Sequence, residues 1–427
     1  MNLLKHNQNF RLVFIGALVS SVGDVLFSFA MGLYILEVTH SALMLSIYGV
    51  IGGVTWILLA PFGGVLVDRM SRVKIVYMTD FVRALNMMFC GVVMCLTKDP
   101  IITMLCLSLA SFINSLNGAL FGPASQAMIP LTVGKNSLVQ ANALMSLMYG
   151  VKDVFGMLLA GVLYASLGAI PIVFLNGISF LLSGITEMFI EINEELPAPS
   201  NKRSQLLIEV KQGFQYIICK NKTLIVIFIV MNFKNLALGP IQSVLVPYLI
   251  NEQIGANETH LSYLYMAIAL GGILGSLIAT KSGGKRRIQH ILSVSLVIEM
   301  ATILIQWISY QSFNTGHFSY LGFLIMLFIA FFASGVVNVF IQVPVLASLQ
   351  KLVDPAYYGR VMSLYTMMTS ITMPISLMIG GIVIDQFGIS VTYLISILFL
   401  LLGIVGIVGS NQLKKVPNPD KVGNSGE

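Results

Sequence analysis

The chain is dominated by long apolar runs, each of about the length that crosses a lipid bilayer. A hydrocarbon core of about 30 Å needs about 20 apolar residues in a helix, and the runs are too long and too continuous for barrel strands. The sequence therefore predicts an all-α polytopic membrane protein with twelve transmembrane helices. The expected spans are residues 10–36, 42–66, 73–96, 101–122, 138–165, 168–190, 222–250, 260–280, 288–310, 318–347, 360–384 and 388–410.

The longest polar stretch divides these spans six and six. Within it, apolar residues recur every three or four positions, which predicts an amphipathic helix over 204–220 on the inner membrane surface. The expected organisation is an N-terminal six-helix bundle, a cytoplasmic linker, a C-terminal six-helix bundle and a cytoplasmic tail. These four parts cover residues 1–190, 191–221, 222–411 and 412–427.

The two halves resemble each other in sequence at an offset of 220 residues. The segment from Gly161 to Gly168 has its counterpart from Gly381 to Gly388. Two repeated six-helix halves are typical of alternating-access secondary transporters, which bind substrate near the midplane of the membrane at the interface of the repeats.

The amino-acid composition excludes several other classes of protein. Only 10% of the 427 residues are charged, 56% are hydrophobic and the mean hydropathy is +0.88, whereas a soluble globular chain carries about 25% charged residues. So few charges cannot cover a water-facing surface of this size. A soluble enzyme, a nucleic-acid-binding domain and a disordered protein are therefore excluded.

The net charge of +6 comes from Lys and Arg residues that gather in alternate loops. If both termini are cytoplasmic, 20 of the 24 Lys and Arg lie in inner segments, three fall within spans and only Lys98 lies outside. This asymmetry follows the positive-inside rule. It predicts a multi-pass protein of the cell membrane with both termini in the cytoplasm. The first run is too long for a cleaved signal peptide, and Asp24 interrupts it.

The loop after the second expected span carries a motif. It reads Gly64-Val-Leu-Val-Asp68-Arg69-Met-Ser71-Arg72 and resembles the G-x-x-x-D-R-x-G-R signature of the major facilitator superfamily, with Ser71 where Gly is usual. The resemblance extends over essentially the whole chain. It implies the major facilitator fold, in which two six-helix pseudo-repeats form a transporter.

Finer segments resemble one branch of that superfamily. Among them are Thr79-Asp80-Phe-Val-Arg83 and Gly122-Pro123-Ala124, which are similar to drug exporters of the macrolide-efflux and enterobactin-exporter branch. This resemblance implies proton-coupled efflux. However, Met157 stands where antiporters of the superfamily typically carry Pro in span five, so proton coupling is a hypothesis and not part of the motif.

The residues of the loop motif are interpreted as a cytoplasmic gate. Asp68 can accept hydrogen bonds from the N-terminus of a neighbouring helix, and Arg69 and Arg72 can pair with carboxylates across the cytoplasmic seam. Together with Gly64, these three residues would then hold the two halves in contact on the cytoplasmic side and stabilise an outward-open state. The alternative is plain topology, in which the basic residues only satisfy the positive-inside rule.

Eight ionisable residues fall within the expected spans, where each charge costs roughly 2.5–3.5 kcal/mol at a helix centre on translocon scales. Each therefore needs a partner or an aqueous cavity. Asp80 and Arg83 are three residues apart on one helix face and are expected to form an intramembrane ion pair. Glu187 lies near the inner end of its span and is expected to reach water. The other five lie near mid-depth and are Asp24, Lys152, Asp153, Lys234 and Glu299.

These five mid-depth residues are the candidates for proton coupling and for the substrate cavity. The resemblance implies that spans one, four, seven and ten line the cavity, which favours Asp24 and Lys234. Competition between a proton and a cationic substrate for one buried acid suffices for antiport. Asp24 is the main candidate for that acid, followed by Asp153 and Glu299. The alternative is a buried salt bridge from Asp24 to Lys234 or Lys152 that only orients helices.

The predicted function is secondary active transport, namely proton-coupled efflux of amphipathic or hydrophobic small molecules by alternating access. The alternative is a dedicated exporter or flippase for one metabolite, such as a siderophore, peptide or lysolipid. A membrane sensor or receptor would need a larger soluble domain. No nucleophile–base pair, metal cluster or nucleotide loop appears. We therefore expect no enzyme activity, metal, cofactor or nucleic-acid partner, and a monomer in the bilayer that uses the proton gradient.

Overall fold

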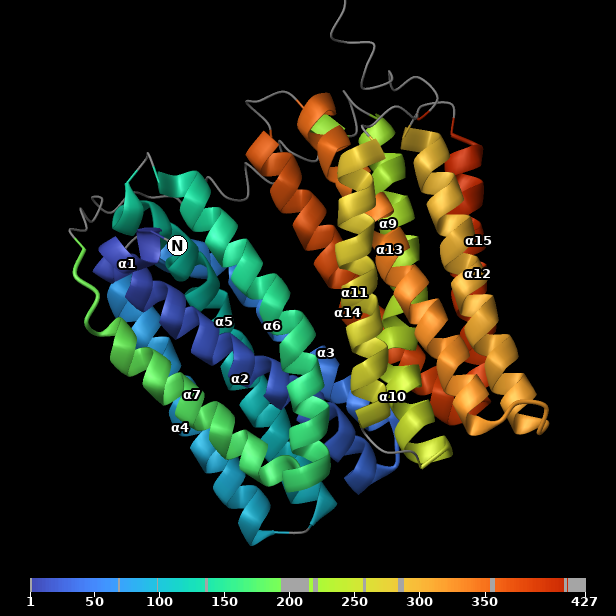
Figure 1. Cartoon of the computed structure of the whole chain (residues 1–427), viewed down its shortest axis with the longest axis horizontal. Helices are drawn as coiled ribbons and strands as arrows, with labels where there is room; N and C mark the ends of the chain where they lie inside the picture. The colour runs from blue at the N-terminus through green and yellow to red at the C-terminus, as the bar shows by residue number, and fades with distance from the viewer. Residues whose placement is uncertain are drawn as a thin grey trace, which may run out of the picture. The chain divides into compact units, whose positions relative to one another are not determined.

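The structure, a computed structural model, describes residues 2–67, 70–97, 99–134, 137–192, 215–217, 222–255, 259–282, 288–353, 358–410 and 413. No strand occurs among them (Figure 1). In an apolar environment a helix satisfies all its backbone polar groups within one segment, so apolar runs of this length become helices. The helices are α1 (Asn2–His6), α2 (Gln8–Thr39), α3 (Ala42–Val67), α4 (Arg72–Leu96), α5 (Pro100–Val133), α6 (Leu138–Leu167), α7 (Ala169–Glu187), α9 (Lys222–Pro240), η2 (Ile241–Leu245), α10 (Val246–Tyr248), η3 (Leu249–Gln253), α11 (Thr259–Ser282), α12 (Ile288–Asn314), α13 (Tyr320–Leu352), α14 (Tyr358–Phe387) and α15 (Ile389–Val408).

Twelve helical segments in the described part of the chain are long and apolar enough to cross a membrane. This finding confirms the predicted fold class. Most observed ends lie within a few residues of the predicted ones, but α5 continues well beyond residue 122, through Pro123 and Pro130, to Val133. Proline inside a membrane helix is tolerated because neighbouring helices and side chains satisfy the backbone groups that it frees.

The seventh span changes its winding along its length. Two π-helical turns, η2 and η3, flank the short helix α10, which contains Pro247. Proline has no N–H to donate, and its ring clashes with the carbonyl four residues earlier. A wider turn relieves that clash, and π turns inside longer helices frequently occur at functional sites.

The sequence repeat has a structural counterpart in two interhelical turns. Gly168 joins α6 to α7 with φ of 75°, and Gly388, at the offset of 220 residues, joins α14 to α15 with φ of 83°. The N–H of each glycine closes the preceding helix, on Tyr164 in the first half and on Ile384 in the second. A left-handed backbone favours glycine, so both halves turn between their fifth and sixth spans by the same device.

The chain forms two compact units. Unit 1 comprises Met1–Lys202 with Ile250–Ser262, and unit 2 comprises Arg203–Leu249 with Tyr263–Glu427. The break at 202/203 falls within the predicted linker. Most of the predicted amphipathic helix over 204–220 lies outside the described residues, as does the predicted tail except for Leu413.

Each unit has its own packing core. In unit 1, α2 and α4 both pack along α7, and α3 packs against α5. In unit 2, α9 packs against α14 and α15, and α12 packs against α13. Residues 250–262 join unit 1, where His40 Nδ1 lies 2.6 Å from Glu252 Oε2.

Glycines bring particular helix pairs into backbone contact. A Cβ atom at Gly63 of α3 would collide with the carbonyl oxygen of Ala119 on α5, and one at Gly335 of α13 would collide with that of Ile268 on α11. Small residues let membrane helices approach this closely. In both halves the pair consists of the second and the fourth span.

Candidate functional site

Asp24 lies well inside α2 and faces α7. Its carboxylate is partly buried and interacts electrostatically with the side chain of Asn176. Gly23 allows this close approach, because a Cβ atom there would collide with Ser179 Oγ. The positive charge of Arg83 also acts on the carboxylate. Asp24 thus lies near a neutral amide side chain of α7 and within the field of a cation on α4.

Lys152 and Asp153 are neighbours on α6 and pair with each other. The ammonium of Lys152 lies 3.3 Å from Asp153 Oδ1 and 5.7 Å from the centre of the Tyr149 ring. Its charge also acts on Asp24, but its ionic contact is with Asp153. The side chain of Asp153 is 59% exposed, which sets it apart from the acids that helices enclose.

The structure places Asp80 and Arg83 on one face of α4. Arg83 Nη1 lies 3.8 Å from Asp80 Oδ1, which is an ionic distance but exceeds that of a hydrogen bond. The guanidinium sits 5.0 Å from the Phe121 ring and 5.2 Å from the Phe180 ring. Glu187, expected to reach water, is only 2% exposed, because α7 turns it toward the helices of unit 1.

Unit 2 holds a separate buried pair, Lys234 on α9 and Glu299 on α12. Lys234 Nζ donates to Asn338 Oδ1 at 2.6 Å, and Ser334 Oγ donates to Glu299 Oε1. Ser334 and Asn338 are four residues apart on α13, so one helix face orients both charges. The two charges attract each other, so Lys234 has a counter-charge within its own unit.

The predicted cytoplasmic gate is only partly described. Gly64 lies in α3 and Arg72 begins α4, where Ser71 Oγ caps the helix by accepting from the backbone N–H of Lys74. Asp68 and Arg69 lie outside the described residues. The gating role of these residues therefore stays a prediction.

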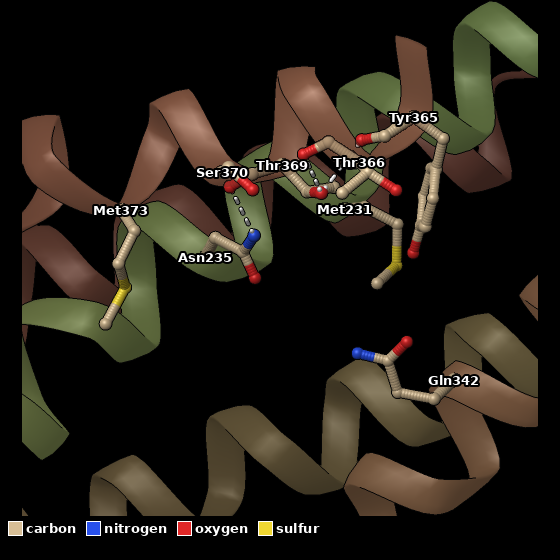
Figure 2. A pocket seen from close by; sticks show the side chains of 8 residues that line it. All are labelled: Met231, Asn235, Gln342, Tyr365, Thr366, Thr369, Ser370 and Met373. Atoms are coloured by element: carbon tan, nitrogen blue, oxygen red, sulfur yellow. Dashed lines mark hydrogen bonds between the residues drawn. The ribbon is translucent and has the colours of Figure 1, made fainter. Parts of the chain in front are cut away.

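Unit 2 also contains a pocket of about 430 Å³ that sequence reasoning missed (Figure 2). Helices α9, α13 and α14 form it, and Gln342 of α13 lies across the opening from the side chains of α14. Asn235 is oriented by donating to the carbonyl oxygen of Thr369 at 3.4 Å. The lining residues are Met231, Asn235, Gln342, Tyr365, Thr366, Thr369, Ser370 and Met373.

The pocket combines neutral polar groups with soft apolar ones. Its amides and hydroxyls can donate and accept hydrogen bonds, and its two methionines can adapt to irregular apolar shapes. None of its lining residues is charged. The only sequence signal was a cluster of polar residues on one face of the eleventh span, with Thr366 and Ser370 four residues apart. Neutral polar residues of this kind are too common in membrane helices to stand out.

Two units of six membrane-spanning helices each, with ionisable residues buried between the helices, are characteristic of polytopic secondary transporters. A family model described as "Transmembrane secretion effector", within the major facilitator superfamily, matches residues 4–423. The chain belongs to this transporter family, and it is not an enzyme. Among the described residues, no group of three or more His, Cys, Asp or Glu side chains could hold a metal ion.

Relatives of the chain include exporters. Macrolide efflux protein A of Streptococcus pyogenes is 23% identical over 388 residues, which cover 91% of this chain and 92% of that protein. The enterobactin exporter EntS of Shigella boydii is 27% identical over 283 residues, which cover 66% of this chain and 65% of that one.

Solved structures of transporters share the fold. A bacterial homologue of the iron transporter ferroportin has a TM-score of 0.72 at 16% identity, covering 94% of this chain and 98% of the other. A transporter of the POT family, solved with 5-aminolevulinic acid, has a TM-score of 0.74 at 12% identity, covering 96% and 97%. At these identities the likeness concerns the fold alone.

Proposed function

We propose that this transporter exports amphipathic or hydrophobic small molecules in exchange for protons, by alternating access. The observation that carries the substrate class is the uncharged pocket of unit 2, in which Met231 and Met373 lie beside amide and hydroxyl groups. Such a lining suits a ligand with apolar surface and scattered neutral polar groups. The macrolide-efflux relative supports this choice.

Asp24 is the proposed site at which proton and substrate compete. Its carboxylate is partly buried, near the side chain of Asn176, and two positive charges, those of Arg83 and Lys152, act on it. Either a proton or a cationic group of the substrate can offset its charge, but not both at once. This exclusion is enough to link export of one to import of the other. The proton gradient would supply the energy, and no cofactor is required.

Inverted membrane vesicles test this proposal. We expect acidification of their interior to drive uptake of a labelled macrolide in the wild type. Asp24→Asn should abolish gradient-driven uptake, because the amide side chain cannot take up and release a proton as the carboxylate does. Asp99→Asn, a matched change at the exposed N-cap of α5, where asparagine can also cap the helix, should leave uptake within about twofold of the wild type. Unchanged uptake by Asp24→Asn would remove this residue from the mechanism.

A dedicated exporter or flippase for one metabolite is the second candidate function. The likeness to an enterobactin exporter favours it. A deletion strain tested against a broad panel of compounds separates the two candidates. Increased sensitivity to several unrelated amphipathic compounds supports a drug exporter, whereas accumulation of a single cellular metabolite supports the dedicated exporter.

We further propose that the protein is a monomer in the cell membrane with both termini in the cytoplasm. The positive-inside distribution of Lys and Arg supports this orientation. The gate formed by Gly64, Asp68, Arg69 and Arg72 would then act on the cytoplasmic side.

A further inference from the structure

A second group of buried acids lies in unit 1, apart from Asp24. Asp80 of α4 and Glu187 of α7 are 0% and 2% exposed, and Ser183, one turn before Glu187, is also fully buried. Ser183 interacts electrostatically with both carboxylates. Gly16 of α2 closes the group, because a Cβ atom there would lie 2.8 Å from Glu187 Oε1. Three helices thus enclose two carboxyl groups.

The positive charge beside these acids is insufficient for both. Arg83 is the cation that acts on Asp80 and on Glu187, and it acts on Asp24 as well. Lys152 on α6 acts on Asp24 but pairs with Asp153. If Asp80 and Glu187 were both ionised, at least one buried negative charge would remain uncompensated. Burying such a charge is strongly unfavourable, and a proton removes it.

Within the described part of the chain, the group also lacks hydrogen-bond donors for most of its carboxylate oxygens. Both carboxylate oxygens of Asp80, Oε2 of Glu187 and the hydroxyl of Ser183 have no hydrogen-bond partner among the described residues. Buried polar atoms are nearly always paired in folded proteins. A carboxylic acid proton would supply a donor where these oxygens now have none.

We propose that Asp80 and Glu187 hold one exchangeable proton between them, next to Ser183, and form a second protonation site of the transporter. Arg83 is the counter-ion that this site shares with Asp24. A proton fits better than a metal cation, because Gly16 packs directly against Glu187 and the guanidinium of Arg83 already occupies the neighbouring position between two aromatic rings.

The site deepens the proposed function, on whose proton coupling its transport role rests. When the pair loses its proton, its net charge attracts Arg83 more strongly, and Asp24 is then less well compensated. Asp24 thereby gains affinity for a proton or a cationic substrate. Protonation of Asp80 and Glu187 would in this way control how strongly Asp24 binds a proton or a cationic substrate.

Infrared spectroscopy of the purified full-length protein tests the site without any substrate. The carbonyl stretching band of protonated carboxylic acids, identified by its shift in D₂O, is measured at neutral pH. Glu187→Gln and Asp80→Asn should each lose the intensity of one acid, because a single remaining carboxylate is balanced by Arg83. Arg83→Gln should gain the intensity of at least one acid, because both carboxyl groups then bind protons. Asp99→Asn, a control at the exposed N-cap of α5, should match the wild type.

Several outcomes would overturn the site. Unchanged intensity in both Glu187→Gln and Asp80→Asn would mean that both acids are ionised. Loss in only one of these variants would mean that the proton belongs to one residue and is not shared. A decrease of the wild-type band when sodium replaces choline would assign the site to a metal cation. If the bands change as expected but vesicles show no proton-driven transport, the site stands and the proposed function fails.

Discussion

At the scale of single residues, the two halves differ in how their buried carboxylates are balanced by cations. Asp80 and Glu299 are 219 residues apart, within one residue of the repeat offset, and both lie on the third span of their half. Glu299 faces one buried cation, Lys234, and accepts from Ser334. Asp80 shares its cation with Glu187 and Asp24. The buried pair of unit 2 is therefore balanced in charge, whereas the buried acids of unit 1 need protons to become so.

The pocket of unit 2 permits a residue-scale prediction about substrate. Gln342→Leu and Asn235→Leu remove hydrogen-bonding groups from the lining while keeping similar volume. A hydrogen bond contributes about 0.5–1.5 kcal/mol, so each variant should raise KM for a transported macrolide roughly 2- to 10-fold. The maximal rate should change less. Initial rates of uptake in inverted vesicles, over a range of substrate concentrations, measure both.

The control is Gln253→Leu, the same substitution at an exposed position at the end of η3. It should leave KM unchanged. If the pocket variants behave like this control, the substrate does not use the amide groups of the pocket.

At the scale of helices, glycine contacts determine which spans can touch. Gly63 brings α3 onto α5, and Gly335 brings α13 onto α11. With no hydrophobic driving force between helices in lipid, association depends on close packing and on interhelical hydrogen bonds. The second and fourth spans of each half are therefore joined by van der Waals contact of their backbones.

Gly335→Ala should destabilise unit 2, because the added Cβ atom meets the backbone carbonyl of Ile268 and not a movable side chain. Overpacking of this kind costs about 1–3 kcal/mol. The measurement is the apparent Tm of the purified protein in detergent. Gly406→Ala on α15 is the control, since a Cβ atom there has nothing within 4 Å. Equal Tm values for the two variants would contradict the contact.

At the scale of the whole molecule, the distribution of basic residues predicts orientation. In a variant without native cysteines, Lys98→Cys should react with a membrane-impermeant thiol reagent in intact cells. Lys285→Cys should react only after the cells are permeabilised, because it lies in a loop assigned to the cytoplasm. Labelling of Lys285→Cys in intact cells would reverse the assigned topology.

Much of the candidate site was visible in the sequence because charge is rare in this chain. Asp24, Arg83 and Lys234 interrupt apolar runs, and an ionisable residue at that depth is conspicuous. Neutral residues such as Gln342 and Thr369 give no such signal, because polar but uncharged side chains are common in membrane helices. The pocket that they line depends on how α9, α13 and α14 converge.

The sequence by itself determined the twelve spans, the repeated halves and the superfamily, because bilayer thickness imposes a fixed length on apolar helices and the loop motif is local. Only the tertiary structure decided which charges compensate one another. Glu187 lies near a helix end, where water would be within reach, yet α2 and α4 enclose it beside Asp80. Electrostatic balance depends on distances across helices, and these follow from packing and not from position along the chain.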